Sequence, residues 1–177
     1  MNVPIFTIEN CPIIKEAVLA YGHFNSVHPG HIRYLKNAAS KGKSLFVAVL
    51  PDTNEGTNRE YKFSQMERAE GLTSLNIVDG ILLLKDEEYS LVNAIKALNP
   101  AFLVLGTEFE NSNESEIIEA IKVMKKNGLK VQFHAGEVQY ASTELLDNSE
   151  SYLQKNNIKK FKIACKKQNI NKVEIIE

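Results

Sequence analysis

Short apolar runs alternate along this chain with longer segments in which apolar residues recur every three or four positions. The apolar runs predict strands at 16–22, 44–50, 78–84, 101–105 and 130–134, because an unbroken run of this length is typical of a strand with both faces covered. The periodic segments predict helices at 30–41, 63–76, 88–98 and 113–127. The pairs Asn99-Pro100 and Asn127-Gly128 are helix stops before the last two strands.

This alternation predicts an α/β fold of the Rossmann-like, doubly wound type, with a parallel five-stranded sheet and flanking helices. Ligands of such sheets bind at the carboxyl ends of the strands, beside the switch in strand order. The last part of the chain differs in character, since residues 149–177 contain seven lysines and no glycine. We therefore expect a domain at 1–148 and a C-terminal helical tail at 149–177.

The composition indicates the class of protein and its expected partners and location, but no specific function. With 44% hydrophobic and 24% charged residues the chain is globular, and its net charge of −1 gives no reason to expect a nucleic acid or a membrane as partner. Cys11 and Cys165 are far apart, so neither a disulfide framework nor a cysteine metal site is indicated. No apolar run approaches membrane-spanning length, and a cytoplasmic location is expected.

The segment after the first long apolar run carries the densest candidate chemistry. His23, His28 and His31 are three of the four histidines, and they follow Gly22 directly before a predicted helix. Pro29 suits the first turn of that helix because proline lacks an N–H. The free N–H groups of a helix start attract phosphate, and two histidines three positions apart share one helix face. The pattern predicts a polyphosphate site with imidazole donors.

Two alternatives for these histidines remain open at this stage. His28 and His31 could cap the helix and pack against it, with no role in chemistry. A zinc site made by His23, His28 and His31 is the other alternative, although no fourth ligand is evident in the sequence.

The decapeptide from Gly22 to His31 reads G-H-F-N-S-V-H-P-G-H and resembles the G-x-F-[D/N]-x-x-H-x-G-H motif of the nucleotidyltransferase superfamily, which includes cytidylyltransferases and adenylyltransferases. The resemblance covers roughly residues 16–148. It includes the strand that ends at Asp52, the segment 103–109 and the segment 140–146, which looks like the start of a late phosphate-binding helix. The chain looks most like the adenylyltransferase half of ADP-heptose synthases, which are often fused to a sugar kinase.

The resemblance implies a nucleotidyltransferase that moves a nucleoside monophosphate from ATP or CTP to a sugar- or polyol-phosphate and releases pyrophosphate, with ATP favoured and Mg²⁺ arriving on the triphosphate. It implies catalytic roles for His28 and His31. The nucleotide-binding residues that it implies are Gly22, His23, Phe24, Asn25, Gly30, Gly106, Glu108, Ser142 and Thr143, and Arg59, Lys62 and Arg68 are candidates for phosphate or substrate contacts. It also implies a homodimer, and a kinase domain or kinase partner beyond the tail.

Two alternatives to this function are a glycerol-3-phosphate-like cytidylyltransferase and a nucleotide-binding module without catalysis. Two departures from the sugar-phosphate relatives bear on the acceptor, because Glu55 and Leu105 stand where those relatives have lysines. Losing two cations is expected to weaken triphosphate or acceptor binding. The departures leave open an acceptor other than heptose phosphate.

Overall fold

The computed structural model describes residues 3–52 and 62–133, which form a parallel six-stranded sheet in the order β1-β4-β3-β2-β5-β6. The strands are β1 (Ile5–Thr7), β2 (Ala17–Gly22), β3 (Ser44–Val49), β4 (Gly80–Leu83), β5 (Phe102–Leu105) and β6 (Lys130–Phe133). The predicted α/β class and parallel sheet are confirmed.

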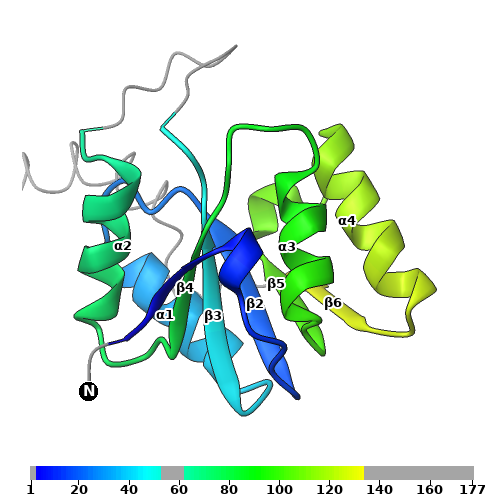
Figure 1. Cartoon of the computed structure of the whole chain (residues 1–177), viewed down its shortest axis with the longest axis horizontal. Helices are drawn as coiled ribbons and strands as arrows, with labels where there is room; N and C mark the ends of the chain where they lie inside the picture. Colours follow the sequence, from blue (N-terminus) through cyan, green and yellow to red (C-terminus); the bar gives the residue numbers. More distant parts are fainter. Residues whose placement is uncertain (1–2, 53–61, 134–177) are drawn as a thin grey trace, which may run out of the picture. The chain divides into compact units, whose positions relative to one another are not determined.

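Four α-helices cover the two faces of the sheet, with α1 and α2 on one face and α3 and α4 on the other (Figure 1). Their bounds are α1 (Pro29–Ala39), α2 (Gln65–Thr73), α3 (Ser90–Leu98) and α4 (Ser115–Lys126), and two short 3-10 helices are η1 (Ile8–Asn10) and η2 (Thr107–Phe109). Each face has its own apolar core cluster, as expected when strands read as unbroken apolar runs.

One strand was not predicted. β1 is only three residues long, follows Pro4, and pairs in parallel with β4 at the edge of the sheet. A segment this short has no usable hydrophobic period, so only its pairing with β4 identifies it as a strand. The five strands and four helices that were predicted all occur, with ends that differ by a few residues. The predicted tail at 149–177 lies outside the described residues.

The switch in strand order lies between β2 and β5. After β2 the chain adds β3 and β4 on one side, and it later adds β5 and β6 on the other. Tyr34 of α1 is buried at the place where the two central strands part. Its hydroxyl donates to the carbonyl of Val104 at 2.6 Å and accepts from the N–H of Tyr21 at 3.1 Å. The side chain therefore satisfies backbone groups that strand pairing leaves open.

A second polar side chain bridges the ends of β3 and β4. The amide of Gln65, the first residue of α2, donates to the carbonyls of Val49 at 2.9 Å and Leu84 at 2.8 Å. These bonds fix the carboxyl ends of β3 and β4, where the loops that follow the two strands begin. Within residues 3–52 and 62–133, no helix has both the length and the apolar character needed to cross a bilayer.

Candidate functional site

His28 caps a helix, and this contact is compatible with its predicted role in ligand binding. It is the N-cap residue of α1, and its Nδ1 accepts a hydrogen bond from the N–H of Gly30 at 3.1 Å. Because Nδ1 is the acceptor, the neutral ring carries its hydrogen on Nε2. The side chain is exposed, so Nε2 remains a donor for a ligand in front of the helix. Capping and ligand binding therefore need not exclude each other.

His31 lies beside His28 and is more enclosed. The two ring centroids are 4.0 Å apart, with an angle of 31° between the ring planes. Burial, together with the nearby His28, lowers the pKa of His31 to about 4, so its ring is neutral near pH 7. Nδ1 of His31 is buried and has no hydrogen-bond partner in the described part of the chain.

Phe24 packs against the His31 ring, and two glycines leave space for the rings of Phe24 and His28. Phe24 has a φ of 52°, is 3% exposed, and packs against His31 with centroids 5.1 Å apart. A Cβ at Gly22 would lie 3.0 Å from the Phe24 ring, and one at Gly30 would lie 2.7 Å from the His28 ring. A side chain at Gly22 would press on the buried Phe24 ring, and one at Gly30 would displace the exposed His28 ring. The contacts of Phe24 support His31, and a direct nucleotide contact stays a prediction.

Arg68 of α2 lies beneath residues 23–28, the segment between β2 and α1 that we call the histidine loop, and its side chain is 1% exposed. Its guanidinium donates to the carbonyl of His23, to the carbonyl of Leu50 at 2.8 Å, to the carbonyl of Phe63 at 3.2 Å and to the carboxylate of Asp52 at 2.7 Å. These bonds join the loops that follow β2 and β3. They support a positioning role, and a direct phosphate contact by Arg68 stays a prediction.

Asn25 makes a second link between the same two loops. Its Oδ1 accepts a hydrogen bond from the backbone N–H of Lys62 at 3.1 Å. The Lys62 side chain is exposed, so the structure brings a cation-bearing residue to the histidine loop. Its contact with phosphate stays a prediction.

Glu108, in the loop after β5, faces solvent, whereas Leu105, the last residue of β5, faces the core. Glu108 is exposed, and its carboxylate lies over Gly106, so a side chain at Gly106 would have to displace it. Leu105 is fully buried in the core cluster that α3 and α4 share with the sheet. Its side chain therefore faces the core, and the expectation that a cation is missing from the site at this position is not supported.

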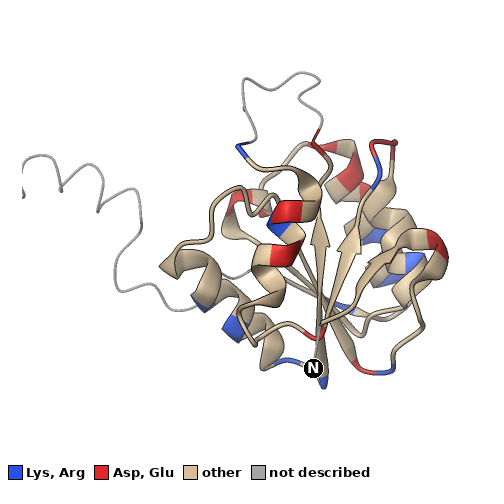
Figure 2. Cartoon of the chain, turned by 60° about the vertical axis from the view of Figure 1, so that its left-hand side comes forward, with Lys and Arg blue, Asp and Glu red and all other residues tan. Residues whose placement is uncertain are grey.

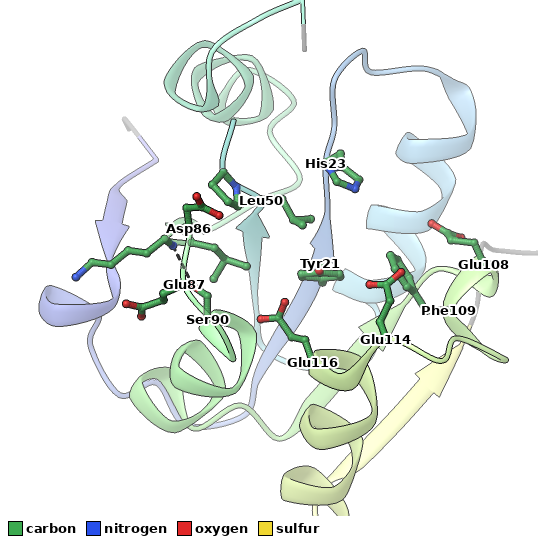
Figure 3. A pocket seen from close by; sticks show the side chains of 13 residues that line it. Tyr21, His23, Leu50, Asp86, Glu87, Ser90, Glu108, Phe109, Glu114 and Glu116 are labelled. Carbon is green, nitrogen blue, oxygen red and sulfur yellow. Dashed lines mark hydrogen bonds between the residues drawn. The ribbon is translucent and has the colours of Figure 1, made fainter. Parts of the chain in front are cut away.

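A pocket of about 510 Å³ opens at the carboxyl ends of the central strands (Figure 3). Its lining residues come from the ends of β2, β3 and β4, from α3 and η2, and from the start of α4. They are Tyr21, His23, Leu50, Pro51, Leu84, Lys85, Asp86, Glu87, Ser90, Glu108, Phe109, Glu114 and Glu116. The pocket reaches the histidine loop at His23 but does not include His28 or His31.

Sequence reasoning missed four of the five acidic residues in this lining. Asp86 and Glu87 follow β4, and Glu114 and Glu116 lie at the start of α4. The signal that could have found them is topological, because every loop after a parallel strand reaches the same edge of the sheet. The oxygen Oε1 of Glu116 also accepts from the N–H of Leu91 at 2.6 Å, which caps the start of α3.

Some predicted residues lie outside the described part of the chain, namely Arg59, Ser142 and Thr143, together with Glu55. Among residues 3–52 and 62–133, no three His, Cys, Asp or Glu side chains are arranged to hold a metal ion. His23, His28 and His31 are all described, so the structure does not support the three-histidine zinc alternative.

Comparison with known proteins agrees with the resemblance seen in the sequence. The profile of the cytidylyltransferase-like family matches residues 19–165. An FAD synthase from Methanosarcina barkeri is 36% identical over 89 residues, which are 50% of this chain and 63% of that protein. The bifunctional protein HldE from Campylobacter fetus is 34% identical over 116 residues, which cover 62% of this chain and 25% of HldE.

The fold is also found in a solved structure. The lipopolysaccharide core biosynthesis protein from Thermoplasma volcanium superimposes with a TM-score of 0.54 and 26% sequence identity, and the match covers 66% of this chain and 92% of that one. Of the two relatives named above, the chain matches less than two thirds of the length of the Methanosarcina FAD synthase and a quarter of the length of HldE.

Proposed function

This chain belongs to the cytidylyltransferase-like family, and from that premise we propose that it transfers a nucleoside monophosphate from ATP or CTP to a phosphorylated acceptor. The observation that carries the proposal is the pair of neighbouring imidazoles at the start of α1. They lie where the free N–H groups of a helix meet the switch point of a parallel sheet.

In the proposed reaction, a phosphate oxygen of the acceptor attacks the α-phosphorus of the triphosphate. A new P–O bond forms, the bond from the α-phosphorus to the oxygen that bridges to the β-phosphate breaks, and pyrophosphate leaves with the electron pair. Such a step needs alignment and hydrogen-bond donors around the phosphorus more than covalent help. In this proposal Nε2–H of His28 donates to the phosphate oxygens, and the neighbouring ring of His31 supports it; the cap hydrogen bond at Nδ1 and the short distance between the two rings are consistent with these roles.

The donors at the start of α1 are imidazoles and backbone N–H groups, which suit phosphate oxygens rather than a hard cation. Magnesium is therefore expected to be held by the triphosphate and water, and when bound it neutralises charge on the pyrophosphate. Arg68 fixes the histidine loop relative to the segment after β3, through its bonds to His23 and Asp52. The imidazole and N–H donors at the start of α1 are then in position before the substrate binds.

We propose a sugar- or polyol-phosphate as the acceptor. The name of the Thermoplasma neighbour, a lipopolysaccharide core biosynthesis protein, supports a sugar phosphate that is activated for a surface glycan. The FAD synthase relatives support a second candidate, because FMN carries its phosphate on a ribityl polyol chain. The adenylyl group of FAD favours ATP over CTP as donor. A glycerol-3-phosphate cytidylyltransferase remains the alternative with CTP.

Pyrophosphate release tests the proposal. The full chain is incubated with Mg²⁺, with ATP or CTP, and with a hexose 1-phosphate, FMN or glycerol 3-phosphate. Release with one acceptor is expected, and His31→Ala should lower turnover by about 100-fold or more, since it removes a preorganised group. Arg33→Ala, at an exposed position of the same helix, is the matched control and should keep wild-type turnover. Nucleotide binding without release under every condition would instead indicate the non-catalytic module.

A further inference from the structure

The pocket beside the histidine loop has an apolar floor and an acidic wall. Tyr21 and Phe109 form part of the floor, with their rings edge to face at 5.4 Å between centroids. In Figure 3, His23 lies on one side of Tyr21, while Glu114 and Glu116 lie on the opposite side. Acidic residues also gather at the end of the molecule toward which the strands point (Figure 2).

The charge of the lining is strongly one-sided. Five carboxylates line the pocket, from Asp86, Glu87, Glu108, Glu114 and Glu116, against a single ammonium, that of Lys85. That ammonium forms an ion pair with Glu9, which does not line the pocket. Burial, together with the neighbouring Glu114, raises the pKa of Glu116, so the carboxylates of these two residues are close enough to repel each other. A ligand that carries a further negative charge would increase this repulsion.

If the acceptor of the proposed reaction occupies this pocket, the position of the pocket relative to α1 fixes the acceptor's orientation. Its phosphate has to reach the donors at the start of α1, and the pocket meets that loop at His23. The part of the acceptor away from its phosphate then lies over Tyr21 and against the carboxylates. Carboxylates accept hydrogen bonds from hydroxyl and ammonium groups, and those bonds are charge-assisted. An aromatic floor adds an attraction for a cation.

We infer that this pocket receives the body of the acceptor and selects phosphomonoesters whose body bears hydroxyl or ammonium groups, while it rejects those with a second acidic group. This inference rests on the proposed function, because it takes the pocket to be the acceptor site of the same reaction. The inference defines the acceptor more closely than 'a phosphate ester'. Esters with a second acidic group, such as a uronic acid phosphate, are excluded because the carboxylates of the pocket repel that group.

Three sugar 1-phosphates test the inference, because two of them differ from the third, glucose 1-phosphate, at a single substituent. The probes are glucosamine 1-phosphate, glucose 1-phosphate and glucuronic acid 1-phosphate, bound to the full chain in low salt and followed by calorimetry and by pyrophosphate release. The carboxylate-bearing probe is expected to bind about tenfold or more weakly than glucose 1-phosphate, and the amine-bearing probe at least as tightly as glucose 1-phosphate. Equal or tighter binding of the uronic acid, or no binding of any probe at millimolar concentration, would overturn the inference.

Charge-removing variants show whether the pocket makes this distinction. Glu114→Gln and Glu116→Gln should each reduce the discrimination against glucuronic acid 1-phosphate several-fold, while Glu110→Gln should leave it unchanged. Glu110 is exposed on the loop after β5 and does not line the pocket. Discrimination that is unaffected in both pocket variants would also overturn the inference. If the binding order holds but no pyrophosphate is released, the proposed catalysis fails and the selectivity of the pocket stands.

Discussion

At the scale of single residues, His28 and His31 differ in their surroundings although they belong to one motif. His28 is exposed and uses Nδ1 to cap α1, whereas His31 is enclosed between His28 and Phe24. Burial disfavours the charged form of His31, so its pKa is low. Two imidazolium rings at this distance would repel each other. A neutral His31 lets both rings lie together in front of the helix.

The first prediction concerns the titration of His31. Its folded pKa of about 4 lies below the usual 6.5, so the unfolded chain binds more protons between these values. The stability that a neutral His31 contributes is therefore fully present above pH 6.5 and is lost as the pH falls toward 4. NMR of the His31 ring should give a midpoint near 4, and the free energy of unfolding in urea should decrease over the same range.

A matched variant separates the two causes of this low pKa. His28→Gln removes the neighbouring ring but leaves His31 buried. The pKa of His31 should then rise while staying below 6.5, because burial is the larger cause. A wild-type His31 that titrates near 6.5 would contradict the described packing.

At the scale of elements, polar side chains from the helices complete the strands at the site. Tyr34 of α1 joins β2 to β5, and Gln65 of α2 joins β3 to β4. Both lie where neighbouring strands end or separate, and each satisfies backbone groups that would otherwise be buried without partners. The helices thus fix the positions from which the site loops start.

The second prediction is that Tyr34→Phe destabilises the fold. The substitution leaves the ring in place but removes the hydroxyl that serves Val104 and Tyr21, and burying such groups unpaired costs about 1–3 kcal/mol. Urea unfolding measures the loss. Tyr89→Phe is the control: Tyr89, the N-cap residue of α3, is half-buried but its hydroxyl reaches solvent, so this change should alter stability by less than about 0.5 kcal/mol. Equal decreases in the free energy of unfolding of the two variants would show that the hydrogen bonds of the Tyr34 hydroxyl do not stabilise the fold.

At the scale of the molecule, the described domain leaves several large apolar side chains exposed. Ile13, Phe63 and Met66 are 71%, 49% and 46% exposed, and β1 and β6 lie at the two edges of the sheet. Exposed apolar groups and open strand edges favour association. They are compatible with the homodimer that the resemblance implies, which stays a prediction.

The third prediction concerns assembly. Light scattering of the full chain at micromolar concentration should give about twice the 19.9 kDa of one chain. Ile13→Ser and Phe63→Ser should shift the mass toward that of a monomer if these side chains lie in the interface. A mass of 19.9 kDa for the wild-type chain over the whole micromolar range would contradict a homodimer.

The sequence by itself determined the alternation of strands and helices, the parallel sheet and the position of His28 and His31 at a helix start. These features depend on local periodicity, on Pro29 and on the spacing within one decapeptide, all of which can be read from neighbouring residues. The resemblance to nucleotidyltransferases started from the same decapeptide and extended over roughly residues 16–148, and the family match confirmed it.

Only the tertiary structure decided how distant residues share the site. It buried Arg68 beneath the histidine loop, turned Leu105 into the core, and added β1 through its pairing with β4. It also brought Glu87 and Glu114 to one pocket from elements that are far apart in the chain. None of these follows from a local pattern, because burial and direction are set by contacts between elements and not by spacing along the chain.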